Sequence, residues 1–564
     1  MLEHTIFVFY ISIIFISTIG YGYLFSKIIY NDFASLNFGY LGIIGFFFLC
    51  LISQFSTFFS PHNYLHNLII HSIGVFTFIL LFLSRKSESL QESKKFLVLL
   101  LILFIGVYVY KNHDDFPYYH LTYALNLSEN KLIIGTGVFS GGFRTPSSLF
   151  FFHSLLYLPL IKYYLFHIGP FLILIFFNYI LITKLIEKYH KSQFDISYFL
   201  TLLNFTFVNV VFYRIGEHGV DRSGQVLLFL AFIIFCELFF FKKDKNEKNV
   251  LFNFFLVSIF LASSTKVLFL IYLIFAAILF FKDKFYKEYL VKKNIFIILI
   301  LISSFSVNLT HSFLNTGCFV FPEKKTCISN LDWSMPTEIV SSMKVHYEWW
   351  AKAGGGPGYS SEMKKDVYIK NFIWVKDWVE RHFFNKISDT VSGIIFISLL
   401  TFILFKTKKK KNFFSRNTFL IYSILFLLFL EWFLSHPAMR YGGFVLWALP
   451  FFIFTSLKIE KYDLSKKKVF FSTVLIIVLT FVTYNLRNVQ RLHKEINFYK
   501  YNLAKSPFFY VKEMKSEITY EDGEFKLYTP PSGQMCWALK TPCSYRRNHI
   551  VKSFLGTKII VGNY

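Results

Sequence analysis

The sequence predicts an all-α integral membrane protein with about fourteen transmembrane helices. Of its 564 residues, 54% are hydrophobic and 21% are aromatic, which is far more apolar than a soluble domain of this length. Apolar runs of about 18 residues, the length of a membrane-spanning helix, recur along the chain. Short lysine-rich clusters separate many of these runs, as the positive-inside rule predicts for a membrane protein.

The expected spans cover most of residues 1–486. They lie near residues 5–30, 38–58, 66–83, 96–110, 164–186, 196–213, 224–241, 250–263, 267–281, 294–309, 389–405, 418–434, 441–457 and 469–486. A short apolar helix at 149–161 is expected at the membrane interface. The first run, Thr5–Ile29, has neither a basic start nor a small-residue cleavage site, so we interpret it as a retained span.

The lysine-rich clusters orient these spans. They start at Arg85, Lys242, Lys282 and Lys406, and a last one ends at Lys468. We place all of them in the cytoplasm. They then explain the formal net charge of +25, so this charge does not indicate a nucleic-acid partner. The N-terminus and the C-terminal tail are then extracytoplasmic, and the expected location is the bacterial inner membrane.

This orientation gathers the polar connections on one outer face. They are 111–148, 214–223, the turn Ser263–Lys266, 310–388, 435–443 and the tail 487–564. We therefore expect a transmembrane domain over 1–486 and an extracytoplasmic cap over 487–564 that packs on the 310–388 loop. Because charge alone set the orientation, the histidines, acids and glycines that share this face are independent support for an outward-facing site.

The first large outer loop contains the candidate catalytic residues. Asp114 and Asp115 directly follow a predicted span, and Pro117 interrupts the helix there. A carboxylate at the lip of a membrane cavity is partly desolvated, which raises its pKa and suits a general base. A simple helix-end charge is the alternative. His113 and His120 are candidates to hydrogen-bond these acids or to bind an acceptor.

The same loop continues with a glycine cluster, Gly135–Gly142, and then Arg144. Glycine permits positive φ and close backbone approach, so the backbone amides here are candidates to cradle an anion, with Arg144 as a further substrate-binding group. A flexible loop explains the glycines equally well. Further along, Trp349 and Trp350 are expected either to stack on a sugar ring or to anchor their loop in the interface.

Other outer connections add candidate substrate-binding groups. Arg222 is a candidate for phosphate, and Glu217 or Asp221 for a sugar hydroxyl, although mutual surface pairing explains these charges as well. Lys266 and Arg440 are exceptions to the charge bias, which suggests that they hold the phosphate of a lipid carrier; snorkelling to headgroups is the alternative. His436, which precedes Arg440 in the same outer connection, is a further candidate substrate-binding residue.

Four of the six cysteines lie in expected outer loops. An oxidising compartment permits disulfides there, and short loops favour Cys318 with Cys327 and Cys536 with Cys543. A zinc site is the alternative, but neither pair has CxxC spacing. The sequence contains no Walker A, GxSxG or HExxH motif, which argues against an ATP-driven pump, a serine hydrolase and a zincin. No metal site is predicted; a divalent cation remains a candidate cofactor.

A polytopic chain with an acidic first outer loop and a soluble tail resembles the GT-C glycosyltransferases. This resemblance implies a polyprenyl-phosphate-linked sugar as donor, a glycan or lipid as acceptor, and a base in that loop, here Asp114 or Asp115. NTGCFVFPEKKTC (Asn315–Cys327), HPAMRYGG (His436–Gly443) and CWALKTPC (Cys536–Cys543) resemble a narrower, largely uncharacterised family of bacterial membrane proteins. The spans that precede the acidic loop depart from the simplest GT-C layout.

We therefore expect transfer of a sugar onto a cell-envelope glycan or lipid, with Lys266, Arg222 and Arg440 stabilising the departing phosphate. The alternatives are an envelope-polysaccharide polymerase or ligase that uses a lipid pyrophosphate, and a transporter or flippase of lipid-linked saccharides. A transporter is expected to show internal repeats and ionisable groups near mid-membrane. Glu237 and Glu431, in or near span ends, keep that alternative open.

The orientation is tested by single-cysteine labelling in intact cells. A reporter at Ser360 is expected to react with a membrane-impermeant reagent, whereas one at Lys410 is expected to react only after the cells are opened. Reversed labelling would overturn the orientation and, with it, the reason for placing the site on the outer face.

Overall fold

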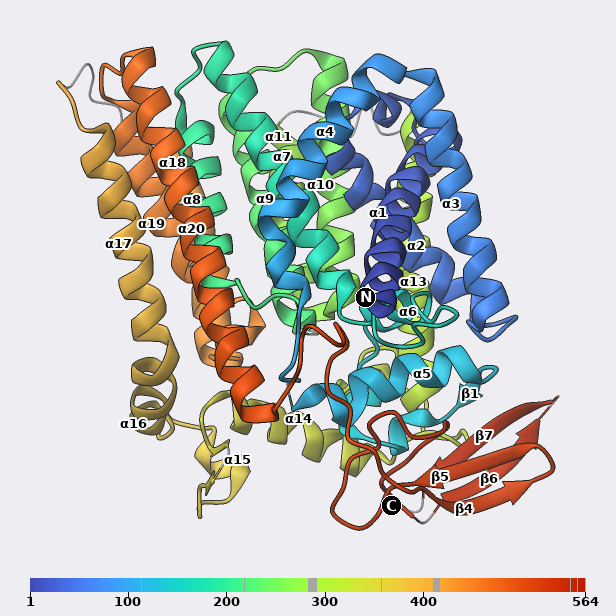
Figure 1. Ribbon diagram of the computed structural model, residues 1–564. Coiled ribbons are helices and arrows are strands. Elements are labelled where there is room, and N and C mark those ends of the chain that lie inside the picture. The colour runs from blue at the N-terminus through green and yellow to red at the C-terminus, as the bar shows by residue number, and fades with distance from the viewer. Residues whose placement is uncertain are drawn as a thin grey trace.

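The computed structural model is a bundle of long helices with a smaller, partly stranded region at one end (Figure 1). It describes residues 1–112, 114–217, 219–282, 292–356, 358–408, 416–547, 549–554 and 556–562. His113 lies outside the described residues. Most residues of the two lysine-rich clusters that start at Lys282 and Lys406 also lie outside them. Both termini lie toward the end of the bundle that carries the strands.

The elements follow one another along the described chain. The helices are α1 (Leu2–Ile28), α2 (Phe38–Ser56), α3 (Tyr64–Ser84), α4 (Lys86–Leu103), the π-helical turn η3 (Phe116–His120), α5 (Leu121–Glu129), α6 (Ser148–Ser154), α7 (Ile168–His190), α8 (Ile196–Val211), α9 (Val220–Phe240), α10 (Lys245–Thr265), η6 (Val267–Tyr272), α11 (Leu273–Lys282), α13 (Lys292–Thr316), α14 (Thr337–Ala351), α15 (Lys365–Tyr368), α16 (Val375–Trp378), η8 (Val379–Ile387), α17 (Ser388–Phe405), α18 (Arg416–Ser435), η9 (Met439–Tyr441), α19 (Gly443–Glu460) and α20 (Lys466–Tyr499). The strands are β1 (Ile133–Ile134), β2 (Gly355–Gly356), β3 (Tyr359–Ser360), β4 (Glu517–Asp522), β5 (Phe525–Thr529), β6 (His549–Phe554) and β7 (Thr557–Gly562).

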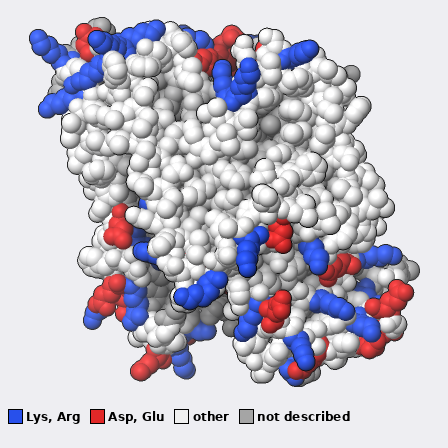
Figure 2. Space-filling model, in the orientation of Figure 1, with Lys and Arg blue, Asp and Glu red and all other residues white. Residues whose placement is uncertain are grey.

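The protein is a multi-pass membrane protein. Among the described residues, 11 helices are long and apolar enough to cross a bilayer. The expected spans near 96–110, 196–213 and 267–281 are also largely helical but fall short: α4 begins inside a lysine-rich cluster, α8 has 16 residues, and 267–282 is a 3-10 turn followed by α11. Figure 2 shows a broad band almost free of charged side chains; its upper end carries mostly Lys and Arg with a few acids, and its lower end carries a more even mixture of both signs.

Glycines let the first helices pack closely. A Cβ at Gly45 would lie 1.8 Å from the carbonyl oxygen of Thr18, and one at Gly20 would lie 1.9 Å from that of Gly74. The backbones of α2 and α3 therefore approach α1 at distances that only small residues allow. In a bilayer such contact supplies the van der Waals packing that holds helices together.

Two elements differ from the expectation. Helix α20 continues to Tyr499, well past the expected end of its span at 486, because its polar extension finds backbone acceptors: Arg487 donates to Val210 O and Arg491 to Tyr108 O. Polar residues need not end a helix where the membrane ends. Helix α6 is shorter than the expected 149–161 helix and is fully buried, rather than lying along an interface.

The end of the chain folds back onto the first large loop and onto residues that follow α13. Strand β7 pairs in parallel with β1 and antiparallel with β6. Leu527 and Ile560 of the tail share a buried apolar cluster with Phe321 and Val340. The tail thus covers residues from two separate connections.

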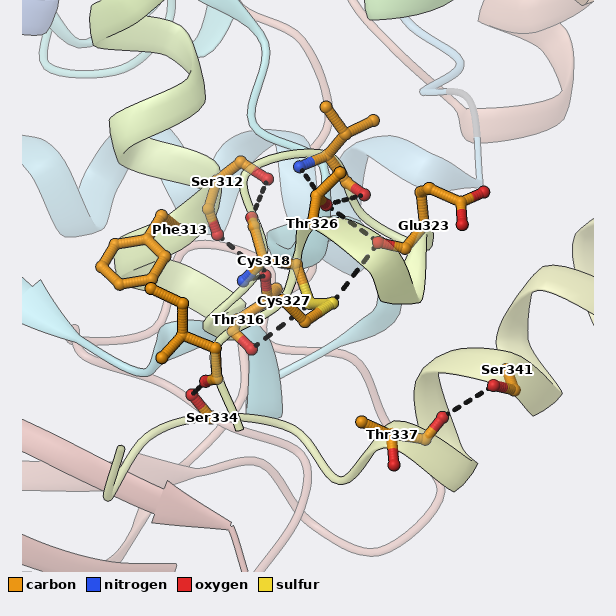
Figure 3. The surroundings of a disulfide bond; sticks show 12 residues. Ser312, Phe313, Thr316, Cys318, Glu323, Thr326, Cys327, Ser334, Thr337 and Ser341 are labelled. Atoms are coloured by element: carbon orange, nitrogen blue, oxygen red, sulfur yellow. Dashed lines mark hydrogen bonds between the residues drawn. A yellow bond between two sulfur atoms is a disulfide. The ribbon is translucent and has the colours of Figure 1, made fainter. Parts of the chain in front are cut away.

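Both expected disulfides are present. Cys318 is joined to Cys327 and Cys536 to Cys543, whereas Cys50 and Cys236 are buried free thiols. Figure 3 shows the first disulfide directly after α13, where the Ser312 hydroxyl donates to Cys318 O at 3.0 Å. That arrangement fixes the start of the long loop that leads to α14.

Candidate functional site

Four acidic and basic side chains from separate parts of the chain meet at the strand-bearing end of the bundle. Asp221 accepts from Lys266 Nζ at 2.5 Å and from Arg440 Nε at 3.0 Å. Arg440 Nη2 in turn lies 3.6 Å from Asp115 Oδ2. We call Asp115, Asp221, Lys266 and Arg440 the Asp221 cluster.

The ends of two neighbouring helices place Asp221 and Lys266 at one level. Helices α9 and α10 are antiparallel neighbours of 21 residues each, so the start of α9 lies beside the end of α10. Asp221 is in the first turn of α9 and Lys266 caps the end of α10. Each charge is therefore on the side that the dipole of its own helix favours.

The short turn η9 is anchored on the same face of α9. Gln225, one helical turn after Asp221, donates to the carbonyl oxygens of Met439 and Arg440 at 3.1 and 3.3 Å. Gly442 then adopts φ +89°, a left-handed conformation that favours glycine, before α19 begins. This geometry aims the Arg440 side chain at Asp221.

Aromatic rings surround the two cations. Lys266 Nζ lies 4.0 Å from the ring centre of Tyr441, and the Arg440 guanidinium lies 5.4 Å from that of Trp350. Burial and the nearby Asp115 carboxylate raise the pKa of Tyr119, and burial raises the pKa of Tyr441 to about 12. Both hydroxyls stay protonated at neutral pH and are available as hydrogen-bond donors.

Lys266 holds its proton less tightly than a lysine in water. Burial lowers the pKa of Lys266 to about 8, although the Asp221 carboxylate opposes this effect; the neighbouring Arg440 lowers the pKa further. In contrast, Asp221 raises the pKa of Arg440. A further anion placed beside Lys266 would stabilise its charged form.

The cluster remains accessible to a ligand. The side chains of Asp115, Asp221, Lys266 and Arg440 retain 27%, 23%, 21% and 34% of their exposure. Asp114, by contrast, is exposed and takes part in no ion pair with a described residue. Of the two candidate bases, the structure therefore brings Asp115, and not Asp114, to the cations.

A separate ionic network lies at the start of the α20 extension. Glu217 pairs with Arg214 and with Arg491, whose Nη1 is 3.3 Å away. Glu495 receives Arg214 at 3.4 Å and Arg491 at 3.6 Å. Glu217 is thus paired within the protein, with Arg214 and with Arg491 of α20 rather than with Arg222.

Arg222 also points away from the Asp221 cluster. Its guanidinium lies 5.8 Å from the ring centre of Phe212, although Asp221 is its neighbour in sequence. Successive residues of a helix point about 100° apart, so one faces α10 and the other does not. The expected joint role of Arg222 with Lys266 and Arg440 is therefore not supported by their placement.

Two predicted histidines lie beside the cluster. His120 is 6% exposed and within electrostatic range of Asp221. His436 Nδ1 lies 3.8 Å from Glu431 and its ring is 5.7 Å from that of Tyr441. Only His120 and His436 therefore border the cluster, and neither contacts Lys266 or Arg440 by a hydrogen bond within the described chain.

Arg144 is a buried cation away from the cluster. It is 3% exposed, donates from Nε to Gly137 O at 3.1 Å and lies over the Phe321 ring. It forms no ion pair with any carboxylate in the described ranges. Burial without an acid partner is costly for a guanidinium, and the nearby Tyr347 hydroxyl supplies part of the compensation.

The glycines and tryptophans serve packing more than ligand binding. A Cβ at Gly142 would lie 2.0 Å from the Tyr119 ring, and the Gly141 amide donates to the Tyr118 hydroxyl. The Gly135 amide likewise donates to Leu314 O, so these two amides already have partners within the protein. Trp349 is 5% exposed and packs against Gly354, so only Trp350 reaches the cluster.

The charged side chains of the described chain form no group suited to a metal ion. In the parts of the chain that the structure describes, no three His, Cys, Asp or Glu side chains lie close enough together to hold a metal ion. The charges of the Asp221 cluster come instead from two carboxylates and two cations.

The comparisons place the chain in a family. A family model described as "Domain of unknown function (DUF8201)" matches residues 5–447. The chain belongs to this family. No curated protein and no solved structure matches the chain. The matched region of this DUF8201 member contains all four residues of the Asp221 cluster and ends before α20 and the tail.

Replacing Asp221 tests whether the cluster holds the helix ends together. Asp221→Asn leaves two cations side by side without their main acceptor, and is expected to cost on the order of 2 kcal/mol of stability. Thermal unfolding in detergent measures this loss as a lower melting temperature. Glu431→Gln is the matched control, because its partly exposed pair with His436 contributes little; equal melting of the two variants would contradict a joining role for Asp221.

Proposed function

We propose that this protein is a GT-C-like glycosyltransferase that moves a sugar from a polyprenyl-phosphate donor to a cell-envelope glycan or lipid. The observation that carries the proposal is the convergence of Asp115 with Lys266 and Arg440 at one end of a membrane bundle. A lipid-linked phosphate reaches its protein site at the membrane surface, where cations recognise it.

The charges suit the departure of a phosphate. Lys266 has three N–H donors and Arg440 has five, more than Asp221 accepts. Asp221 acts as the positioning residue that keeps the two cations together. Because the cluster has two positive and two negative groups, an arriving phosphate finds donors held in place without a large excess of positive charge that would bind any anion.

The proposed reaction needs no ATP, because the lipid-linked donor already carries the leaving group. The acceptor hydroxyl oxygen forms a bond to the anomeric carbon of the sugar, and the bond from that carbon to the phosphate oxygen breaks. Asp115 takes the proton of the acceptor hydroxyl. Lys266 and Arg440 stabilise the negative charge that the leaving polyprenyl phosphate gains.

The proposed location is the bacterial inner membrane, with the cluster and tail on the outer side. The lysine-rich end in Figure 2 and the disulfides at the opposite end support this orientation. The acceptor then meets the donor outside the cell.

Two alternative functions, a polymerase or ligase and a transporter, make different demands on these residues. A polymerase or ligase would use a lipid pyrophosphate at the same cations, so donors of both kinds belong in the assay. For a transporter, the sequence indicated Glu237 and Glu431. Glu431 lies 3.8 Å from His436, near the end of α18. Glu237 is 2% exposed and already paired with Lys184 at 2.5 Å, near the end of α9 that lies away from the cluster. Glu237 and Lys184 thus form a structural ion pair.

The adjacent acids provide a matched test of catalysis. Asp115→Asn keeps the shape of the side chain but removes the base, so transfer is expected to fall by about 10²–10⁴-fold. Asp114→Asn is the control and is expected to keep most of the rate, because Asp114 is exposed and away from the cations. Sugar transfer from polyprenyl-phosphate donors by purified variants in nanodiscs provides the measurement.

The proposal fails if Asp115→Asn, inserted and as stable as the wild type, retains full transfer. It also fails if the wild type transfers nothing from any phosphate or pyrophosphate donor but moves lipid-linked sugar across a vesicle membrane.

A further inference from the structure

A cleft lies between η3 and the tail, next to the Asp221 cluster but separate from it. It has a volume of about 450 Å³ and is lined by Tyr118, the segment 530–535, Tyr545 and Arg547. This volume is in the range of small-molecule sites. None of its lining residues belongs to the cluster.

The second disulfide joins the two walls that the tail contributes. Cys536 directly follows the segment 530–535, and Cys543 precedes Tyr545 by two residues. The Tyr528 amide donates to Pro542 O, and the Ser544 amide donates to Tyr528 O, both at 2.9 Å. The cleft is thus a braced feature of the tail and not a gap between loose loops.

The disulfide loop also fixes the tail on the helices that follow Asp115. The Trp537 amide donates to Pro117 O at 3.1 Å, and the Thr541 hydroxyl donates to Glu129 at 2.7 Å. The third wall of the cleft, Tyr118, belongs to η3, and its hydroxyl is 2.9 Å from that of Tyr545. The cleft and the candidate base are therefore built on the same turn of the chain.

Tyrosines connect the cleft with the cluster. Tyr118 faces the cleft, while its neighbour Tyr119 lies within electrostatic range of Asp115 and Arg440. Tyr347 lies within such range of both Tyr545 in the cleft and Tyr441 in the cluster. Tyr119 and Tyr347 thus lie between residues of the cleft and residues of the cluster.

We infer that this cleft binds the saccharide part of the acceptor. Tyrosine rings offer an apolar face to the C–H side of a sugar ring and a hydroxyl to its edge. Gln534, whose side-chain oxygen receives Lys512 Nζ at 2.7 Å, and the Ser532 hydroxyl add groups that pair with sugar hydroxyls. Arg547, held by Glu517 at 3.0 Å, adds a charged donor at the wall.

This inference rests on the proposed transfer reaction, since it assigns the acceptor of that reaction to the cleft beside the cluster. It places the acceptor on the tail and the lipid donor on the bundle, so that the two substrates approach Asp115 from different sides. The family match ends before the tail, so the cleft is assembled largely from residues outside the matched region.

The test measures binding without a donor. Purified protein in nanodiscs is exposed to soluble tetrasaccharides of neutral hexoses, N-acetylhexosamines and uronic acids. At least one class is expected to bind. Ser532→Trp, at an exposed position, fills the cleft without touching the cluster and is expected to weaken that binding at least tenfold; Tyr545→Ala is expected to do the same. Phe554→Ala removes an exposed aromatic of the same tail that does not line the cleft, and is expected to change nothing.

The outcomes separate this inference from the proposed function. If no tetrasaccharide class binds, or Ser532→Trp binds like the wild type, the cleft is not an acceptor site even where transfer activity is present. If the cleft variants abolish saccharide binding but the wild type transfers no sugar, the binding site stands and the transfer reaction fails.

Discussion

The pair of contacts that Asp221 makes with Lys266 and Arg440 is the constraint on which the site depends. These two contacts tie the start of α9 to the end of α10, the next helix, and to the turn before α19, which is far along the chain. They also hold Lys266 and Arg440 together, and in this position Arg440 reaches Asp115. Because all four side chains keep part of their exposure, the interaction that joins the helix ends also leaves them open to a ligand.

A second constraint fixes the other side of the site. The tail crosses back over the first large loop, and its disulfide loop hydrogen-bonds to Pro117 and Glu129. The segment that carries Asp115 thus contacts Arg440 on one side and the docked tail on the other. The two disulfides brace loops whose apolar cores are small, where covalent links contribute most to order.

Much of this arrangement could be predicted from sequence because it follows from one-dimensional signals. Apolar runs located the helices, and local cysteine spacing indicated the disulfides. The bias in lysine and arginine placed Asp115, Asp221, Lys266 and Arg440 on one expected face.

The sequence could not show which of two neighbouring residues joins the site. The side chains of Asp114 and Asp115, or of Asp221 and Arg222, point in different directions, and those directions depend on packing. Tyr119, Tyr441 and Arg491 were missed because, in a chain with 35 tyrosines and many polar outer residues, nothing local distinguishes them. The extension of α20 was missed because polar residues do not end a helix when tertiary partners satisfy them.

The central claim is that the Asp221 cluster receives the headgroup of a lipid-linked sugar. A polyprenyl-phosphate sugar with a photoreactive group on the sugar reports the headgroup position and not the lipid-facing surface. After irradiation in nanodiscs and peptide mapping, the account predicts cross-links to the segments around Asp115, Asp221, Lys266 or Arg440, suppressed by excess unlabelled donor and by Lys266→Met. Cross-links confined to the lysine-rich end of the bundle, or insensitive to both competitor and Lys266→Met, would contradict it.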